Sequence, residues 1–195
     1  MKEGTKKESL IKNLYMLEPL QREVLDCFLK TKTALSVNEI WTFLLNRFYD
    51  RIHEQIMNLI KEGKIVDKDG ILFPSNSIFS RTPVEIYVSK YLPPKNVALE
   101  DVCGAMLNFS LAFQSAKDER SILYAKRKFV SQLYQFPSFR TIEEVANSLV
   151  LLGYLSTHPS SDKRKKTLYS LNPDFVEAYE EMERKKELEK KGGKV

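Results

Sequence analysis

Four adjacent cations, Lys163-Arg164-Lys165-Lys166, form the densest positive charge in this sequence of 195 residues. Such side chains can neutralise phosphates, and the counterions released make binding to nucleic acid salt-dependent and largely independent of base sequence. The net charge is only +5, but residues 81–173 hold 13 basic and 8 acidic side chains. The counts are 12 and 11 in residues 1–80, and 6 and 7 in residues 174–195. The run therefore indicates a local phosphate-binding site, with a solvated loop as the plain alternative.

Six further side chains are candidates for contact with DNA, because they fall on the solvent-facing sides of two expected helices: Arg47, Arg51, Asn58, Lys61, Arg140 and Asn147. The amide of Asn147 could pair with an adenine edge, although an exposed helix asparagine is more often merely solvated. Acidic residues share the same two faces and would repel phosphate: Asp50, Glu54, Glu143 and Glu144. An acidic residue in the first turn of a helix is favoured by the helix dipole. The same carboxylates could equally indicate that a helix contacts a protein.

The sequence lacks the motifs that carry catalysis: it has no P-loop, no glycine-rich dinucleotide turn, no H-E-x-x-H and no nucleophile elbow. Cys27 and Cys103 fall on apolar helical patterns, which predicts buried free thiols in a reducing cytoplasm. His53 and His158 lack the spacing of metal ligands. No apolar run approaches the roughly 20 residues that a membrane span needs. We therefore expect a cytoplasmic, non-catalytic protein without metal or cofactor, a nucleoid-associated or nuclear location being left open.

The first half of the chain has the order of elements of a winged helix-turn-helix. A helix is expected from Pro19 to near Lys30, and Ser36-Val37-Asn38-Glu39 has the form of a capping box that opens a second helix. A third helix is expected over about 48–62, with Gly63 as its stop. Two short apolar runs around Asp69-Gly70 then predict a β-hairpin.

The second half predicts helices over 98–115 and 119–135, the latter with Lys126, Arg127 and Lys128 around its outer side. Thr141-Ile142-Glu143-Glu144 again has the form of a capping box, and its helix runs to Gly153. A polar loop with the basic run and a strand over 167–171 follow. We expect a further charged helix from 174 onward.

The stretch from about 140 to 172 resembles the MarR-type winged-helix regulators. The resemblance rests on a leucine-rich helix end with Gly153, on Asp162-Lys163-Arg164 in the place of the family's wing motif, and on the strand Leu168–Leu171. Taken with the order of elements in the first half, this resemblance implies a mainly α fold with small β-hairpin wings, built from two winged-helix domains. It also implies a transcriptional regulator, or a replication-associated binder, that contacts double-stranded DNA. Homodimerisation through the helix at 98–115 or the C-terminal helix is a further expectation.

The expected organisation has five consecutive segments: a polar arm at 1–18, a first winged-helix domain at 19–76, a linker at 77–97, a second winged-helix domain at 98–173 and a charged helix or tail at 174–195. Tandem winged helices also resemble subunits that bridge larger assemblies, such as kleisin-associated and endosomal-sorting subunits. A protein-interaction module is therefore the main alternative, since fold alone does not choose. In a third arrangement only the N-terminal domain is a winged helix and the rest is a helical dimerisation or ligand-binding domain.

Overall fold

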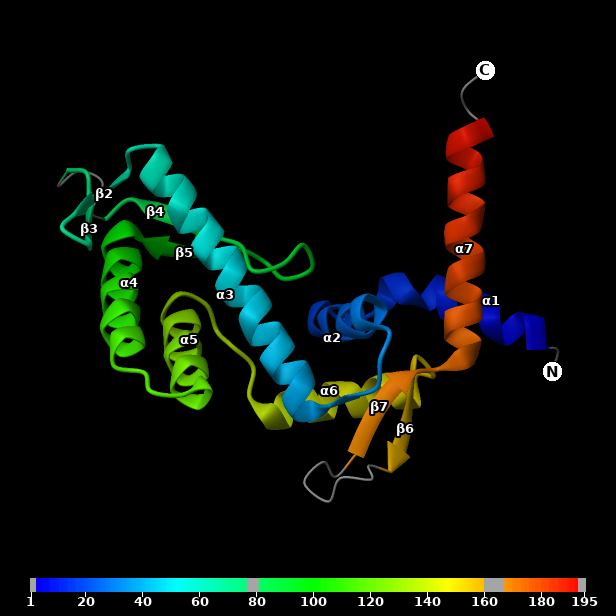
Figure 1. Cartoon of the computed structure of the whole chain (residues 1–195). Coiled ribbons are helices and arrows are strands. Elements are labelled where there is room, and N and C mark those ends of the chain that lie inside the picture. The colour runs from blue at the N-terminus through cyan, green and yellow to red at the C-terminus, as the bar shows by residue number, and fades with distance from the viewer. Residues whose placement is uncertain (1–2, 77–80, 160–166, 193–195) are drawn as a thin grey trace. The chain divides into compact units, whose positions relative to one another are not determined.

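The computed structural model describes residues 3–76, 81–159 and 167–192, and it is mainly α-helical with small antiparallel strand pairs (Figure 1). This confirms the expected class of a mainly α chain with small β-hairpins. Within the described ranges, no helix combines the length and the apolar character that a membrane crossing requires.

The chain forms two compact units, and one of them is discontinuous in sequence. Unit 1 comprises Met1–Ile40 and Phe139–Val195, whereas unit 2 comprises Trp41–Ser138. This division differs from the consecutive domains at 19–76 and 98–173 that the sequence suggested. The physical reason is long-range strand pairing, because the strand before residue 37 pairs with a strand near the C-terminus.

Unit 1 contains four helices, one 3-10 turn, three strands and the first turn of a fifth helix among its described residues. In chain order they are α1 (Glu3–Asn13), η1 (Leu14–Met16), α2 (Pro19–Thr31), β1 (Leu35–Ser36), the start of α3 (Val37–Lys61), α6 (Phe139–Leu151), β6 (Leu155–Pro159), β7 (Thr167–Leu171) and α7 (Pro173–Gly192). The predicted helix at Pro19 is confirmed. Pro19 occupies its first turn, where a missing N–H costs nothing, and Glu18 and Gln21 form its capping box.

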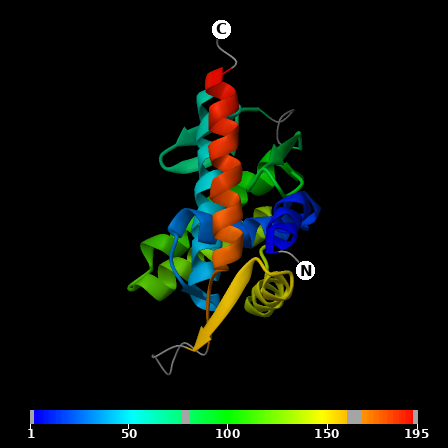
Figure 2. The same ribbon diagram turned by 90° about the vertical axis from the view of Figure 1, so that its right-hand side faces the viewer.

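The sheet of unit 1 has the strand order β1-β7-β6 and is antiparallel throughout. Leu35 pairs with Tyr169, while β6 and β7 pair from Leu155 opposite Leu171 to Pro159 opposite Thr167. The strand expected over 167–171 is therefore confirmed as half of a hairpin. Figure 2 shows β7 leading directly into the foot of α7.

The N-terminal segment expected as a polar arm is part of the packed structure of unit 1. Leu10 and Leu17 are buried, and α1 lies against α7 with an ion pair of 2.6 Å between Lys7 Nζ and Glu177 Oε2. The buried Tyr154 donates its hydroxyl proton to the carbonyl of Leu10 over 2.9 Å. A buried hydroxyl needs such a partner, so this bond ties α1 to the end of α6.

The two helices expected from Ser36 to about residue 62 are a single helix, α3, and the expected break near residue 47 is wrong. No glycine or proline interrupts the sequence of α3, so nothing in its backbone favours a turn. Apolar residues spaced three or four apart form one continuous buried stripe: Ile40, Leu44, Phe48, Ile52, Ile56 and Leu59. The predicted start and stop are both confirmed. Ser36 and Glu39 exchange capping hydrogen bonds, and Gly63 follows the helix with φ +70°.

Unit 2 consists of the larger part of α3 followed by β2 (Ile65–Lys68), β3 (Ile71–Pro74), β4 (Pro83–Ile86), β5 (Lys95–Ala98), α4 (Leu99–Gln114) and α5 (Glu119–Leu133). The hairpin predicted around Asp69-Gly70 is β2–β3. Both turn residues have positive φ, +57° and +79°, which is the geometry that an Asp-Gly pair favours. The helices expected over 98–115 and 119–135 are confirmed as α4 and α5.

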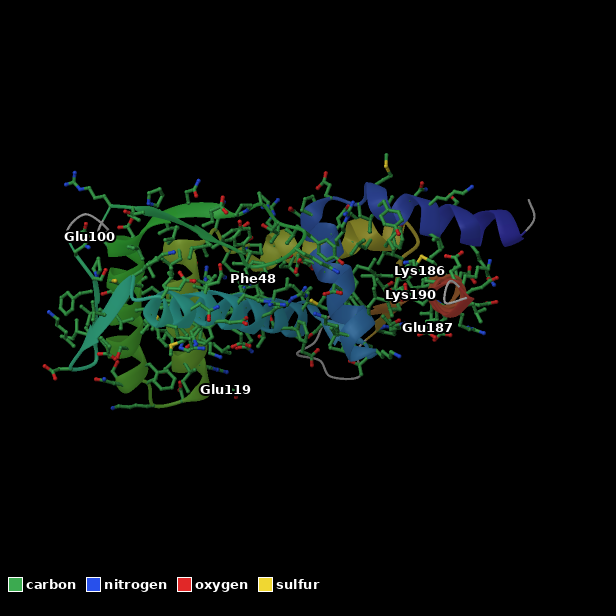
Figure 3. All side chains as sticks on the ribbon, turned by 90° about the horizontal axis from the view of Figure 1, so that it is seen from above. Phe48, Glu100, Glu119, Lys186, Glu187 and Lys190 are labelled. Carbon is green, nitrogen blue, oxygen red and sulfur yellow. The ribbon has the colours of Figure 1, made fainter. Side chains whose placement is uncertain are left out.

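Aromatic rings dominate the core of unit 2. Phe48 lies on α3 (Figure 3) and is fully buried, with its ring edge-to-face against Tyr134 at 6.1 Å and Phe136 at 5.5 Å. Phe136 in turn contacts the ring of Trp41 at 5.3 Å. The rings of residues 134 and 136 thus join the segment after α5 to α3.

The capping box expected at Thr141-Ile142-Glu143-Glu144 is wrong, because α6 begins two residues earlier, at Phe139. Thr141 lies inside the helix, and Glu144 instead pairs with Arg140. A threonine three residues before a glutamate can also lie inside the first turn of a helix. The capping-box pattern alone therefore does not locate the first residue of α6.

Both cysteines should resist alkylation in the folded protein. Cys27 and Cys103 are free thiols with 0% and 6% of their surface exposed, and burial raises the pKa of the Cys103 thiol to about 11. Because the thiolate is the nucleophile, only roughly one Cys103 in a thousand is reactive at pH 8. Mass spectrometry after iodoacetamide should find unlabelled native protein and two labels per chain in denaturant. Rapid labelling of the native chain would contradict this packing.

Candidate nucleic-acid interface

The four cations Lys163, Arg164, Lys165 and Lys166 lie outside the described residues. The strands on either side are described, and they pair up to Pro159 opposite Thr167. The basic run therefore belongs to the sequence that connects the two paired strands of the β6–β7 hairpin. On the described strands, Thr157, His158 and Pro159 are exposed, and Nε2 of His158 lies 2.7 Å from Oγ of Ser170.

The outward face of α6 carries one of the predicted cations together with two carboxylates. Arg140 is 88% exposed, and its Nε lies 2.9 Å from Oε1 of Glu144, one helical turn along. Glu143 is also exposed. Arg140 is thus already paired, and the two glutamates leave this face with a net charge of −1. The structure thus has Glu143 and Glu144 on the same face of α6 as Arg140, as the sequence predicted.

Asn147 lies on the same face of α6, and it is oriented by the sheet. Its Oδ1 accepts a hydrogen bond of 2.9 Å from the hydroxyl of Tyr169 on β7. The pKa of Tyr169 is raised, first by burial and then by the negative charge of Glu143. The hydrogen bond uses one lone pair of the amide oxygen, while the amide NH₂ group is left to donate.

The other four predicted residues belong to unit 2, all on α3. Arg51, Asn58 and Lys61 are exposed, while Arg47 is half-buried. Arg51 forms an ion pair of 3.6 Å with Glu54, which is one of the acidic residues expected on this face. The positive charge of Arg51 is therefore partly compensated. The six candidates outside the basic run are therefore divided between two units, two in unit 1 and four in unit 2.

The sequence prediction gave no site to α5, although the outer side of this helix holds three exposed cations that make no ion pair within the described residues. Arg120, Arg127 and Lys128 are exposed on one side of this helix, together with Tyr124. Lys126, expected on that outer side, instead lies against α3. Its Nζ donates a hydrogen bond of 2.8 Å to Oδ1 of Asn46 and lies 4.8 Å from the centre of the Tyr49 ring. The spacing of the cations along the helix was the signal that could have identified this surface.

A groove of about 650 Å³ in unit 1 lies between the end of α2, β7 and α7. Apolar side chains such as Leu29, Leu171 and Tyr179 line it. Its rim includes Glu180 and Arg184, which pair across one turn of α7 at 3.8 Å. Since the rim carries charges of both signs, charge alone does not select a class of ligand.

Among the described residues, no three His, Cys, Asp or Glu side chains are grouped so that they could hold a metal ion. Comparison of the chain with protein-family models, with curated proteins and with solved structures finds no match. The function is therefore argued from the geometry and the charges of this chain alone.

Proposed function

We propose that the protein binds double-stranded DNA and that unit 1 does so as a winged helix. The observation that supports this most is the order β1-β7-β6 of its sheet, with α6 directly before β6. A winged helix has three helices, a short strand after the first of them, and a hairpin after the third that pairs with this strand. In unit 1, α2, β1, the start of α3, α6 and the β6–β7 hairpin follow that sequence of elements.

In this proposal, unit 2 is an insertion between the second and the third helix of the winged helix. The insertion point falls inside the continuous helix α3 on one side and at the start of α6 on the other. The basic run at 163–166 then occupies the wing, as its resemblance to MarR-type regulators implies. The third helix of such a domain enters the major groove, and the wing contacts the neighbouring backbone.

The distribution of charge favours DNA binding mainly through the cations of the wing. The described outward face of α6 offers Arg140, already paired with Glu144, and the amide of Asn147. Cations that contact phosphates position a protein on DNA, whereas contacts with base edges give specificity. We therefore propose salt-dependent binding with little preference for base sequence, in a non-catalytic cytoplasmic protein that acts in transcription or replication. Binding as a homodimer is part of the proposal, since dimers span two half-sites.

Replacing Lys163, Arg164, Lys165 and Lys166 with alanine should weaken binding to a labelled duplex. Four lost phosphate contacts should flatten the plot of log affinity against log salt by roughly 3 to 4 units. Fluorescence anisotropy between roughly 50 and 200 mM salt measures both the affinity and the slope.

The matched control removes four cations from α7, which lie on exposed turns: Arg184, Lys185, Lys186 and Lys190. Three of these already pair with glutamates of the same helix. The control should leave the slope nearly unchanged. Equal losses in the two variants would mean that total charge, not the wing, governs binding.

A protein partner is the second candidate function, and the outward face of α6 favours it. Glu143 and Glu144 are exposed there, and Leu151 at the end of the helix is 89% exposed. An acidic helix face with an exposed leucine suits a protein surface better than a phosphate backbone. If the protein does not bind DNA even at low salt, the proposal of DNA binding is wrong and the proposal of a protein partner is favoured.

A further inference from the structure

We propose that the outward face of α5 in unit 2 is a second phosphate-contacting surface for double-stranded DNA. We call this surface the basic stripe, and it consists of Arg120, Tyr124, Arg127 and Lys128. The proposal rests on the proposed function, because it takes DNA as the ligand. Its evidence is separate, however, because it comes from described residues of the other unit and not from the wing.

Helical spacing brings the members of the basic stripe onto one face. At 100° per residue, positions 120, 124, 127 and 128 fall within an arc of about 100°. All four side chains are exposed, whereas Phe129, Val130 and Leu133 on the opposite face are buried. Packing of α5 against α4 and α3 therefore turns the stripe toward solvent.

The cations of the stripe differ from the predicted cations Arg51 and Arg140, which are held in ion pairs with glutamates of their own helices. Among the described residues, ion pairs engage Arg51, Arg140 and Arg184, but none engages Arg120, Arg127 or Lys128. Phosphate is attracted most strongly where positive charge is not compensated locally. The stripe therefore offers three charges to an anionic backbone, compared with a net charge of −1 on the outward face of α6.

The carboxylates nearest in sequence lie at the N-terminal end of α5. Asp118 caps the helix, accepting hydrogen bonds from the backbone N–H of Ser121 at 2.8 Å and from its hydroxyl at 2.6 Å. These bonds, and to a lesser degree the charge of Arg120, hold the pKa of Asp118 below its usual value. Glu119 follows at the first residue of α5 (Figure 3). Both acids thus serve the start of the helix and leave the later turns of the stripe positive.

Tyr124 supplies the second feature of a phosphate-contacting face. It lies between Arg120 and Lys128 along the stripe and is 66% exposed. A tyrosine hydroxyl donates readily to phosphate oxygens, and its ring adds contact area without adding charge. An exposed aromatic ring flanked by cations that make no ion pair is suited to contact with a nucleic-acid backbone.

The test compares three variants of the full chain in the same duplex-binding assay. The stripe variant carries Arg120→Gln, Arg127→Gln and Lys128→Gln, because glutamine keeps helix propensity while it removes charge. Loss of up to three phosphate contacts should flatten the salt slope by roughly 2 to 3 units and weaken binding at least about tenfold near 0.1 M salt. The control, Lys185→Gln, Lys186→Gln and Lys190→Gln on α7, removes the same charge and should change little.

Arg127 also lies 5.9 Å from the centre of the Trp41 ring, so the fold of the stripe variant must be checked. A companion variant with Arg120→Lys and Arg127→Lys keeps the charge and should retain the salt slope. If the wild type binds DNA and the stripe variant keeps both affinity and slope, the stripe has no role, while the proposed function stands. If the wild type does not bind DNA at all, the proposed function fails and the stripe proposal fails with it.

Discussion

Replacing Phe48 with alanine should lower the free energy of unfolding of unit 2 by about 3–5 kcal/mol. Phe48 has no exposed surface, and its ring packs edge-to-face against both Tyr134 and Phe136. The truncation removes apolar burial, leaves a cavity among rings that cannot collapse freely, and breaks two aromatic contacts. Domains of this size are stable by only about 5–15 kcal/mol, so the loss is a large share of the total.

The chain provides its own probe for this measurement. Trp41 is the single tryptophan of the sequence, is 6% exposed and belongs to unit 2. Its fluorescence during urea unfolding should show the transition of Phe48→Ala at much lower urea concentration. Phe113→Ala is the matched control, because Phe113 is 48% exposed and should change stability far less. Similar shifts in the two variants would mean that Phe48 is not a central core residue.

Replacing Asp50 with proline should destabilise unit 2 by about 3 kcal/mol or more. Asp50 is exposed in the middle of α3, where a proline removes one backbone hydrogen bond and clashes with the carbonyl four residues before it. If residues 48–62 were a separate helix, position 50 would lie in its first turn, which tolerates proline. The substitution therefore distinguishes a continuous helix from two consecutive ones.

Asp50→Ala separates the effect of the proline ring from the loss of the carboxylate. Alanine at this exposed helix position should change stability by less than about 0.5 kcal/mol. Trp41 fluorescence in urea measures both variants, and hydrogen exchange of the α3 amides locates the change. Nearly equal stabilities of the proline and alanine variants would contradict a continuous α3.

The outcome at α3 shows which sequence signals were sufficient. Ser36 and Gly63 marked the two ends correctly, because a capping side chain and a residue with positive φ act within a few residues of the boundary. The predicted internal break had no comparable signal. It came from the expectation of a short second helix, whereas the apolar stripe continues through residue 48 without a change of phase.

Part of the candidate site could be predicted from the sequence, because runs and helical spacing of charged residues are local features. The basic run is visible in the sequence, and so is the spacing of Arg120, Tyr124, Arg127 and Lys128 on one face of a helix. Whether a cation is already paired depends on its neighbours in space. Arg51 and Arg140 found partners three and four residues along their helices, whereas Lys126 turned inward to Asn46.

Most helices of the chain, the Asp69-Gly70 hairpin turn, the glycines that follow α3 and α6, and the burial of the two cysteines could be predicted from the sequence alone. These features depend on local backbone preferences and on apolar periodicity, which a single sequence contains. The pairing of Leu35 and Ser36 with Tyr169 and Leu168 is visible only in the folded chain, and so is the unit that residues 41–138 form between the two parts of another. Strand pairing across such a separation follows from the packing of a whole core, since one short strand can pair equally well with many partners.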